Sequence, residues 1–168
     1  MNRINSFSNS RAPVAAAQGA DIRIANPEGP RELIMIVDDE DFPCLLAERV
    51  LTDEGYRVIT ARDGFRALDI YKKLQTEVDL VILDFVMPLM DGSAVFNGLR
   101  RINPQVAVVL TSGFTAGVDK LNGMLANGLR GFIPKPLTQK KLLLHVRTVL
   151  DAMQVKAAKE PVPVGVGE

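Results

Sequence analysis

Five apolar residues run without interruption into two aspartates in the stretch Leu33-Ile34-Met35-Ile36-Val37-Asp38-Asp39. A strand that is apolar at every position is buried on both faces, as in a parallel sheet covered by helices. Four similar runs follow, at 57–61, 80–83, 106–110 and 131–133. The pattern therefore predicts a parallel five-stranded sheet.

Segments with helical spacing separate these runs. Apolar residues recur every three or four positions, for example at Phe42, Leu46 and Val50. Five strand–helix units in series predict an α/β, doubly wound (βα)5 fold with right-handed crossovers. Pro134 closes the fifth run, so that strand belongs at a sheet edge, as in the flavodoxin-like strand order 2-1-3-4-5.

Composition divides the 168 residues into three parts. Residues 1–30 are rich in Asn, Ser, Ala, Gly and Pro, and residues 154–168 are rich in Pro, Gly and Val. Such segments bury too little apolar surface to offset their chain entropy, so both are expected to be flexible tails. Residues 31–153 are expected to form a single domain.

Charge and residue counts exclude several classes of protein. Lys plus Arg number 20, as do Asp plus Glu, so no net charge attracts nucleic acid or an acidic membrane. A single cysteine, Cys44, excludes an internal disulfide and a cysteine-based zinc cluster, and the single His145 disfavours imidazole-rich sites. No apolar stretch approaches the roughly 20 residues of a membrane span, and none resembles a secretory signal. We expect no direct nucleic-acid or membrane partner and a cytoplasmic location.

Polar residues stand where the predicted strands end. Asp38 and Asp39 follow the first strand, Asp84 the third, Thr111 the fourth and Lys135 the fifth. The carboxyl ends of parallel strands line the functional crevice of an open sheet, so these groups should converge. Crowded carboxylates repel one another unless a cation neutralises them, and oxygen ligands suit Mg²⁺. A carboxylate beside Mg²⁺ can attack phosphorus and form an acyl phosphate.

Four motifs occur in order, each at a strand end: Val37-Asp38-Asp39-Glu40, Asp84-Phe85-Val86-Met87-Pro88-Leu89-Met90-Asp91-Gly92, Leu110-Thr111-Ser112-Gly113 and Phe132-Ile133-Pro134-Lys135-Pro136. Together they resemble a response-regulator receiver domain of two-component signal transduction, over nearly all of residues 31–153. The resemblance implies that Asp84 is the phosphoacceptor. It implies that Asp38 and Asp39 hold Mg²⁺, with Asp39 favoured as the direct ligand, and that Asp84 and the Val86 backbone carbonyl complete the protein's ligands.

The remaining motif residues match the family's switch. By resemblance, Thr111 is the hydroxyl that moves toward the phosphoryl group, and Lys135 pairs with that group and the carboxylates. The Lys135–Pro136 bond is expected to be cis. Phe132 stands at the switch-aromatic position, where the family often has tyrosine, so its part in the switch must be packing alone.

The leading hypothesis is a stand-alone receiver, since the residues after 153 are too few for an output domain. Its partners would be a sensor histidine kinase or histidine phosphotransfer protein, and a downstream protein that meets the fourth helix, fifth strand and fifth helix. A homodimer that forms on phosphorylation is compatible with the same surface. The only reactions expected of the chain are self-phosphorylation and autodephosphorylation at Asp84.

Two other readings remain. An adaptor with the receiver fold could bind partners regardless of phosphate, but it would not need the full acidic set, Thr111 and Lys135. A phosphohydrolase of the haloacid-dehalogenase type needs an Asp-x-Asp pair after its first strand. Here Asp38 and Asp39 are adjacent, and Val86 stands two positions after Asp84.

Overall fold

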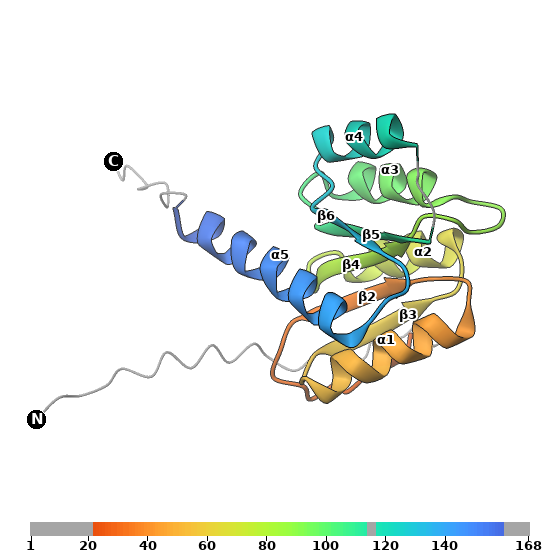
Figure 1. Cartoon of the computed structure of the whole chain (residues 1–168). Coiled ribbons are helices and arrows are strands. Elements are labelled where there is room, and N and C mark those ends of the chain that lie inside the picture. Colours follow the sequence, from red (N-terminus) through yellow and green to blue (C-terminus); the bar gives the residue numbers. More distant parts are fainter. Residues whose placement is uncertain (1–21, 114–116, 160–168) are drawn as a thin grey trace, which may run out of the picture.

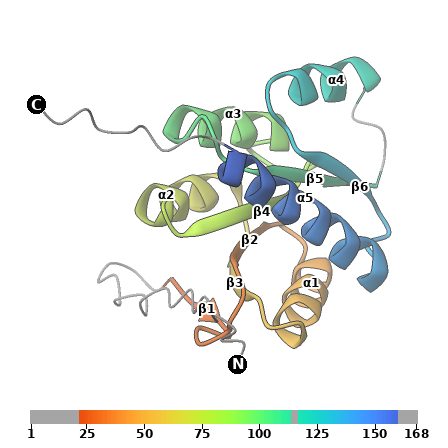
Figure 2. The ribbon, with the colours of Figure 1, turned by 90° about the vertical axis from the view of Figure 1, so that its left-hand side faces the viewer.

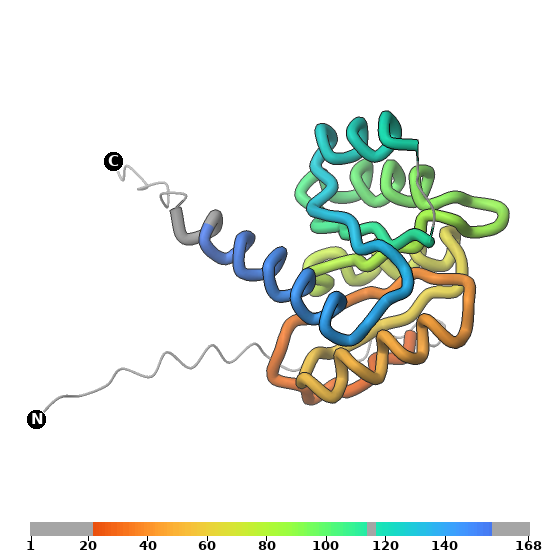
Figure 3. The backbone as a smooth tube through the Cα atoms, in the orientation of Figure 1, coloured from red at the N-terminus to blue at the C-terminus, as the bar shows by residue number. Residues whose placement is uncertain are grey.

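Apolar strands alternate with amphipathic helices along a computed structural model of the chain, which describes residues 22–113 and 117–159. The strands are β1 (Ile24–Ala25), β2 (Leu33–Val37), β3 (Arg57–Ala61), β4 (Val78–Asp84), β5 (Val108–Ser112) and β6 (Gly131–Pro134). The helices are α1 (Asp41–Asp53), α2 (Gly64–Leu74), α3 (Gly92–Ile102), α4 (Val118–Ala126) and α5 (Gln139–Lys159). Figure 3 traces this alternation from β2 to α5.

The sheet has the strand order β1-β3-β2-β4-β5-β6, and β2 to β6 pair in parallel (Figure 1). These five parallel strands reproduce the order 2-1-3-4-5, so the predicted α/β fold is confirmed. Strand β6 lies at the sheet edge, where Pro134 removes no donor from a central ladder.

The first strand, β1, lies inside the segment expected to be a tail. Ile24 and Ala25 pair antiparallel with Ile59 and Val58 of β3, so the sheet has six strands within the described residues rather than five. The Arg23 guanidinium holds Glu48 of α1 at 3.1 Å. The ordered chain therefore begins before residue 31. A two-residue strand between polar and proline-rich neighbours leaves no period-2 pattern to detect.

The last helix differs from its expected end as well. Helix α5 continues to Lys159, beyond the boundary at residue 153. The rest of the two expected tails, residues 1–21 and 160–168, lies outside the described residues. No helix in the described part of the chain is long and apolar enough to span a membrane.

Helices cover both faces of the sheet, so the protein has two hydrophobic cores. Helices α2 and α3, with Met124 of α4, pack on one face. Helices α1 and α5 pack on the other face, with Cys44 and Val146 among the buried residues (Figure 2). This double cover explains why β2 is buried at all five positions.

Of the three apolar residues whose spacing predicted helix α1, only Val50 is buried. Its buried residues are Cys44, Ala47, Val50 and Leu51. Phe42 is 75% exposed and Leu46 is 40% exposed. Small residues at 44 and 47 allow the helix to approach the sheet closely, which outweighs the larger apolar side chains on the outer face.

One ion-pair network ties α5 to the amino end of the sheet. Arg147 donates to Glu32 at 3.1 Å, to the Tyr56 hydroxyl at 3.1 Å and to Asp151 at 2.8 Å. Burial alone would raise the pKa of Glu32, but the hydrogen bond and charge of Arg147 outweigh it, so the pKa is lowered.

We expect Arg147→Met to lower the free energy of unfolding by about 1 kcal/mol at pH 7, because it leaves the half-buried Glu32 carboxylate without its cation. A carboxyl whose pKa is lowered in the fold loses its stabilising contribution as the pH falls, so the difference should shrink in acid. Urea denaturation at pH 7 and pH 4 measures the loss of stability and its dependence on pH. The control Arg49→Met removes an exposed pair with Asp53 and should change stability by less than about 0.5 kcal/mol. Equal losses in the two variants would contradict this assignment.

A glycine permits close packing where α3 begins. A β-carbon at Gly92 would lie 2.6 Å from the Asp84 carbonyl oxygen and 2.7 Å from the Phe85 Cα. Both are backbone atoms at the end of β4, so they cannot move aside cheaply. Gly123 of α4, by contrast, has no atom within 4 Å of that position.

Gly92→Ala should therefore destabilise the protein by about 1–3 kcal/mol. Gly123→Ala should stabilise it by about 0.5–1 kcal/mol, since alanine loses less conformational entropy in a helix. Thermal unfolding of both variants beside the wild type measures the two signs. A neutral Gly92→Ala would show that this close approach is not needed.

Candidate functional site

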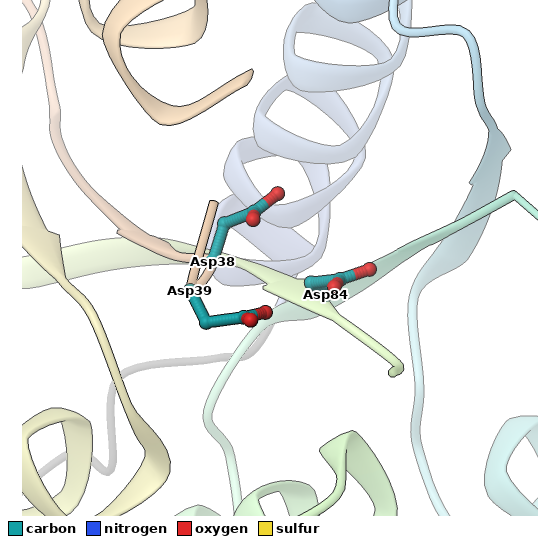
Figure 4. Close-up of side chains that lie close together, drawn as sticks. All are labelled: Asp38, Asp39 and Asp84. Atoms are coloured by element: carbon teal, nitrogen blue, oxygen red, sulfur yellow. The ribbon is translucent and has the colours of Figure 1, made fainter. Parts of the chain in front are cut away.

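The three aspartates meet because their strands are neighbours. Val37 of β2 is paired with Leu83 of β4, so Asp38 and Asp39 follow β2 beside Asp84, the last residue of β4. One carboxylate oxygen from each of the three lies within 4.8 Å of the others. Figure 4 shows the side chains together at the carboxyl end of the sheet. The predicted convergence of the three carboxylates is thus present.

Lys135 supplies a positive charge inside this group. Its Nζ lies 3.1 Å from Asp38 Oδ2 and 3.2 Å from Asp84 Oδ1. The segment after β6 is held by a hydrogen bond from the Lys135 amide to the Ser112 carbonyl. The Lys135–Pro136 peptide bond is cis, as expected.

Burial and charge perturb the Asp84 carboxyl. Asp84 is 3% exposed and Asp38 5%. Burial raises the pKa of Asp84 to about 6, the charge of Lys135 opposes this rise, and the negative charges of Asp38 and Asp39 add to it. Desolvation lowers the pKa of Lys135, but Asp84 and Asp38 outweigh that effect and raise it. Lys135 therefore stays charged and offsets only part of the repulsion.

The donor set fits a hard divalent cation. Asp38 accepts the Glu40 amide on Oδ1 and Lys135 on Oδ2, so both of its oxygens are engaged. Asp39 is only half-buried. Asp39 and Asp84 could therefore offer oxygens to Mg²⁺ directly, with Asp38 in support.

Thr111 lies directly beside the phosphoacceptor candidate. It is paired with Asp84 in the parallel register of β4 and β5 and is 3% exposed. Phe132 lies on the next strand, paired with Leu110. It is half-buried against the core under α2 and α3, outside the carboxylate group. Of the predicted residues, Asp38, Asp39, Asp84, Thr111 and Lys135 come together, and Phe132 packs nearby.

The loop 85–91 between β4 and α3 forms the outer rim of the site. Val86 is 66% exposed. Leu89 is 93% exposed and has a φ of 67°, in the left-handed region that bulky residues rarely adopt. At the end of this loop the Asp91 side chain accepts the Ala94 amide and caps α3.

Sequence reasoning missed one cation at this rim. Lys120 of α4 lies 3.2 Å from Asp91 Oδ2 and 5.0 Å from the centre of the Phe85 ring. No motif marks Lys120, which lies in α4, a helix whose sequence signal is weakened by Gly123. The Asp91-Gly92 pair, typical of a helix start, was the only local signal for its partner.

Asp84→Asn should stabilise the protein in EDTA by about 1–2 kcal/mol at pH 8, because the raised pKa shows that the fold disfavours the charged carboxylate. The Asp84 carboxyl holds its proton up to about pH 6 in the folded wild type but only up to about pH 3.8 in the unfolded chain. The free-energy cost of the charged Asp84 carboxylate in the fold therefore shrinks as the pH falls from about 6 to 3.8. The gain should therefore be smaller at pH 5. Urea denaturation at both pH values measures it, with the exposed Asp53→Asn as control. A variant less stable than the wild type at pH 8 would contradict the assigned repulsion.

Comparison with known proteins identifies the family. The model of the response regulator receiver domain matches residues 34–147. The sensor kinase CckA of Brucella abortus is 34% identical over 140 residues, which cover 83% of this chain but only 15% of that protein. The chemotaxis protein CheY of Treponema pallidum is 35% identical over 126 residues, which cover 74% of this chain and 86% of CheY. Against the transcriptional regulator ycf27 of Porphyridium aerugineum, the chain spans 54% of the relative's length.

Solved structures agree with this comparison. The chain is similar to a structure from Borrelia burgdorferi described as a CheX–CheY–BeF₃–Mg²⁺ complex, with a TM-score of 0.68 and 30% identity. That match covers 74% of this chain and 98% of the solved chain. With its five-unit fold and its acidic group at the carboxyl edge of the sheet, the chain belongs to the response regulator receiver family of two-component signalling.

Proposed function

We propose that this receiver is a phosphoacceptor regulator, in which Asp84 takes a phosphoryl group from the phosphohistidine of a sensor kinase or phosphotransfer protein. One observation carries the proposal: the buried Asp84 carboxylate lies with those of Asp38 and Asp39 within 4.8 Å, with Lys135 at 3.2 Å. Crowded carboxylates destabilise the fold, whereas their uncompensated negative charge suits a site that binds a divalent cation, which in turn can accommodate a phosphoryl group.

In the proposed transfer, an Asp84 oxygen attacks phosphorus as the bond between phosphorus and the donor imidazole breaks. The imidazole leaves with the electron pair of that bond, and the product is an acyl phosphate. Lys135 faces the Asp84 carboxylate and would stabilise the negative charge on the phosphoryl oxygens. Its partner Asp38 keeps the ammonium in place.

Asp39, Asp84 and the Val86 backbone carbonyl would hold Mg²⁺, supported by Asp38. When bound, the ion neutralises charge on the phosphoryl oxygens and on the attacking carboxylate. Asp84 itself titrates near pH 6, so the carboxylate is ionised at neutral pH and is available as a nucleophile.

The proposed switch uses Thr111 and the exposed surface beside it. Thr111 is the neighbour of Asp84 across the β4–β5 ladder, within reach of a local rearrangement toward the phosphoryl group. Phe132 would follow by packing, since it has no hydroxyl group. Helix α4, β6 and α5 form the proposed output surface, where Val118, Leu125 and Leu144 are exposed.

The partners follow from this surface. We place the regulator in the cytoplasm and propose that it acts through a downstream protein, or through a second copy of itself when phosphorylated. The similarity to a chemotaxis protein, CheY, over 86% of that protein's length supports a signalling role. The chain would catalyse nothing beyond its own phosphorylation and dephosphorylation.

A phosphate-independent adaptor is the second candidate. It predicts partner binding that is unchanged by loss of the Asp84 carboxylate. The crowded carboxylates and Lys135 favour the phosphoacceptor, because an adaptor gains nothing from the repulsion that raises the pKa of Asp84.

Incubation with acetyl phosphate and Mg²⁺ should label the wild type once per chain, and EDTA should abolish the label. Asp84→Asn should show only background, because it lacks the attacking carboxylate. The control Asp53→Asn, an exposed carboxylate of α1, should label like the wild type. Intact-mass spectrometry of the 80-Da adduct is the measurement. Equal labelling of Asp84→Asn and wild type, or no label in either, would reject the proposal.

A further inference from the structure

Lys120 joins α4 to both ends of the loop 85–91. Its Nζ lies 3.2 Å from Asp91 Oδ2, at the far end of the loop. The same ammonium lies 5.0 Å from the ring centre of Phe85, the residue next to Asp84. A cation at this distance over an aromatic ring is attracted by the ring's quadrupole. One side chain of α4 thus contacts the segment that carries the Val86 carbonyl.

Backbone hydrogen bonds fix the two ends of this loop. The Phe85 amide donates to the Thr111 carbonyl at 2.8 Å, and the Phe85 carbonyl accepts from the Gly92 amide at 2.9 Å. Asp91 Oδ1 accepts the Ala94 amide at 2.8 Å, which leaves Oδ2 for Lys120. The ends are therefore fixed to β5 and α3, and Lys120 adds the link to α4.

The middle of the loop is strained and exposed. Leu89 holds a φ of 67°, at a cost of about 1 kcal/mol or more for a bulky side chain, and Val86 is 66% exposed. Strain of this kind persists only where surrounding contacts hold it. The contacts of Lys120 with Phe85 and Asp91 restrain the loop on both sides of Val86.

Helix α4 depends on this link in return. Met124 is its only buried residue, while Val118 and Leu125 are exposed. An element with so little buried apolar surface opens locally at low free energy. The pair between Lys120 and Asp91 fastens the first turns of α4 to the rim of the acidic site.

We propose that Lys120 is a positioning residue: it restrains the loop that carries the Val86 carbonyl, the expected backbone ligand, and it couples occupancy of the acidic site to the docking of α4. This inference rests on the proposed function. By linkage, if the Lys120 contacts strengthen cation binding by some factor, the bound cation strengthens the docking of α4 by the same factor.

Mg²⁺ affinity tests the proposal, because a positioning role and a purely electrostatic role of Lys120 predict opposite changes in affinity when the lysine is replaced. A lysine that acts only through its charge repels Mg²⁺, so Lys120→Met would tighten binding. A positioning lysine requires the reverse, and we expect Lys120→Met to weaken Mg²⁺ binding about threefold to tenfold in calorimetric titration. Lys120→Arg, which keeps the cation, should restore the affinity to within about twofold of wild type. An unchanged or tighter affinity in Lys120→Met overturns the proposal.

Two further variants locate the effect. Asp91→Asn keeps an oxygen to cap α3 but loses the charge, and it should weaken Mg²⁺ binding clearly less in Lys120→Met than in the wild type. Lys73→Met, which removes the exposed pair with Asp69 on α2, is the matched control and should bind like the wild type. Additive losses in the double variant would show that Asp91 and Lys120 act separately and would contradict the link.

Hydrogen exchange of the metal-free protein supplies a readout that does not depend on activity. Lys120→Met should exchange faster than the wild type in α4, and Mg²⁺ should slow exchange there in the wild type only. Lys120 is 47% exposed, so its replacement should not unfold the domain. If the wild type accepts phosphate and Lys120→Met matches it in affinity and exchange, only this inference fails. If the wild type binds Mg²⁺ but takes no phosphate, only the proposed function fails. A wild type that binds no Mg²⁺ overturns both.

Discussion

Repulsion among three crowded carboxylates, two of them buried, is the constraint on which the rest of the site depends. Asp38 and Asp84 are almost fully buried and Asp39 stands beside them, within a few ångströms. The fold accepts this cost because Lys135 pairs with two of the three. The charge that remains uncompensated raises the pKa of Asp84. A site left partly unneutralised by its own residues is suited to take up a cation and then a phosphoryl group.

The parallel sheet brings the three carboxylates together at one edge, and helix α4 lies beside that edge. Neighbouring parallel strands end at the same edge, so residues 46 positions apart in the chain become neighbours there. Because helices cover both faces of the sheet, the polar residues of the site lie at the carboxyl edge of the strands. Among the described helices α4 has the fewest buried residues, and its Lys120 forms an ion pair with Asp91 at the rim of the site. Lys120 therefore links α4 to the loop at the rim of the site.

Sequence patterns predicted those features of the molecule that depend on which residues follow one another along the chain. Strands that are apolar at every position identified the doubly wound sheet, and the residues that end them identified the acidic group and Lys135. Sequence patterns did not predict several features that depend on contacts between segments distant in the chain. Strand β1 is two residues long and pairs with the outer edge of β3. Apolar spacing predicts helix α1 but not its inner face, because Phe42 is exposed while the small residues Cys44 and Ala47 are buried. Lys120 contacts Phe85 and Asp91, which no spacing rule links to it.

The position of the bound metal tests the central claim most directly. Crystals soaked in Mn²⁺, an anomalous scatterer that takes the same oxygen ligands as Mg²⁺, would locate the ion without any assumption about phosphate chemistry. The account predicts one strong anomalous peak at the carboxyl edge of the sheet, at direct-ligand distance from Asp39, Asp84 and the Val86 carbonyl. A saturating soak that leaves this position empty, or a peak bound elsewhere on the domain, would contradict it.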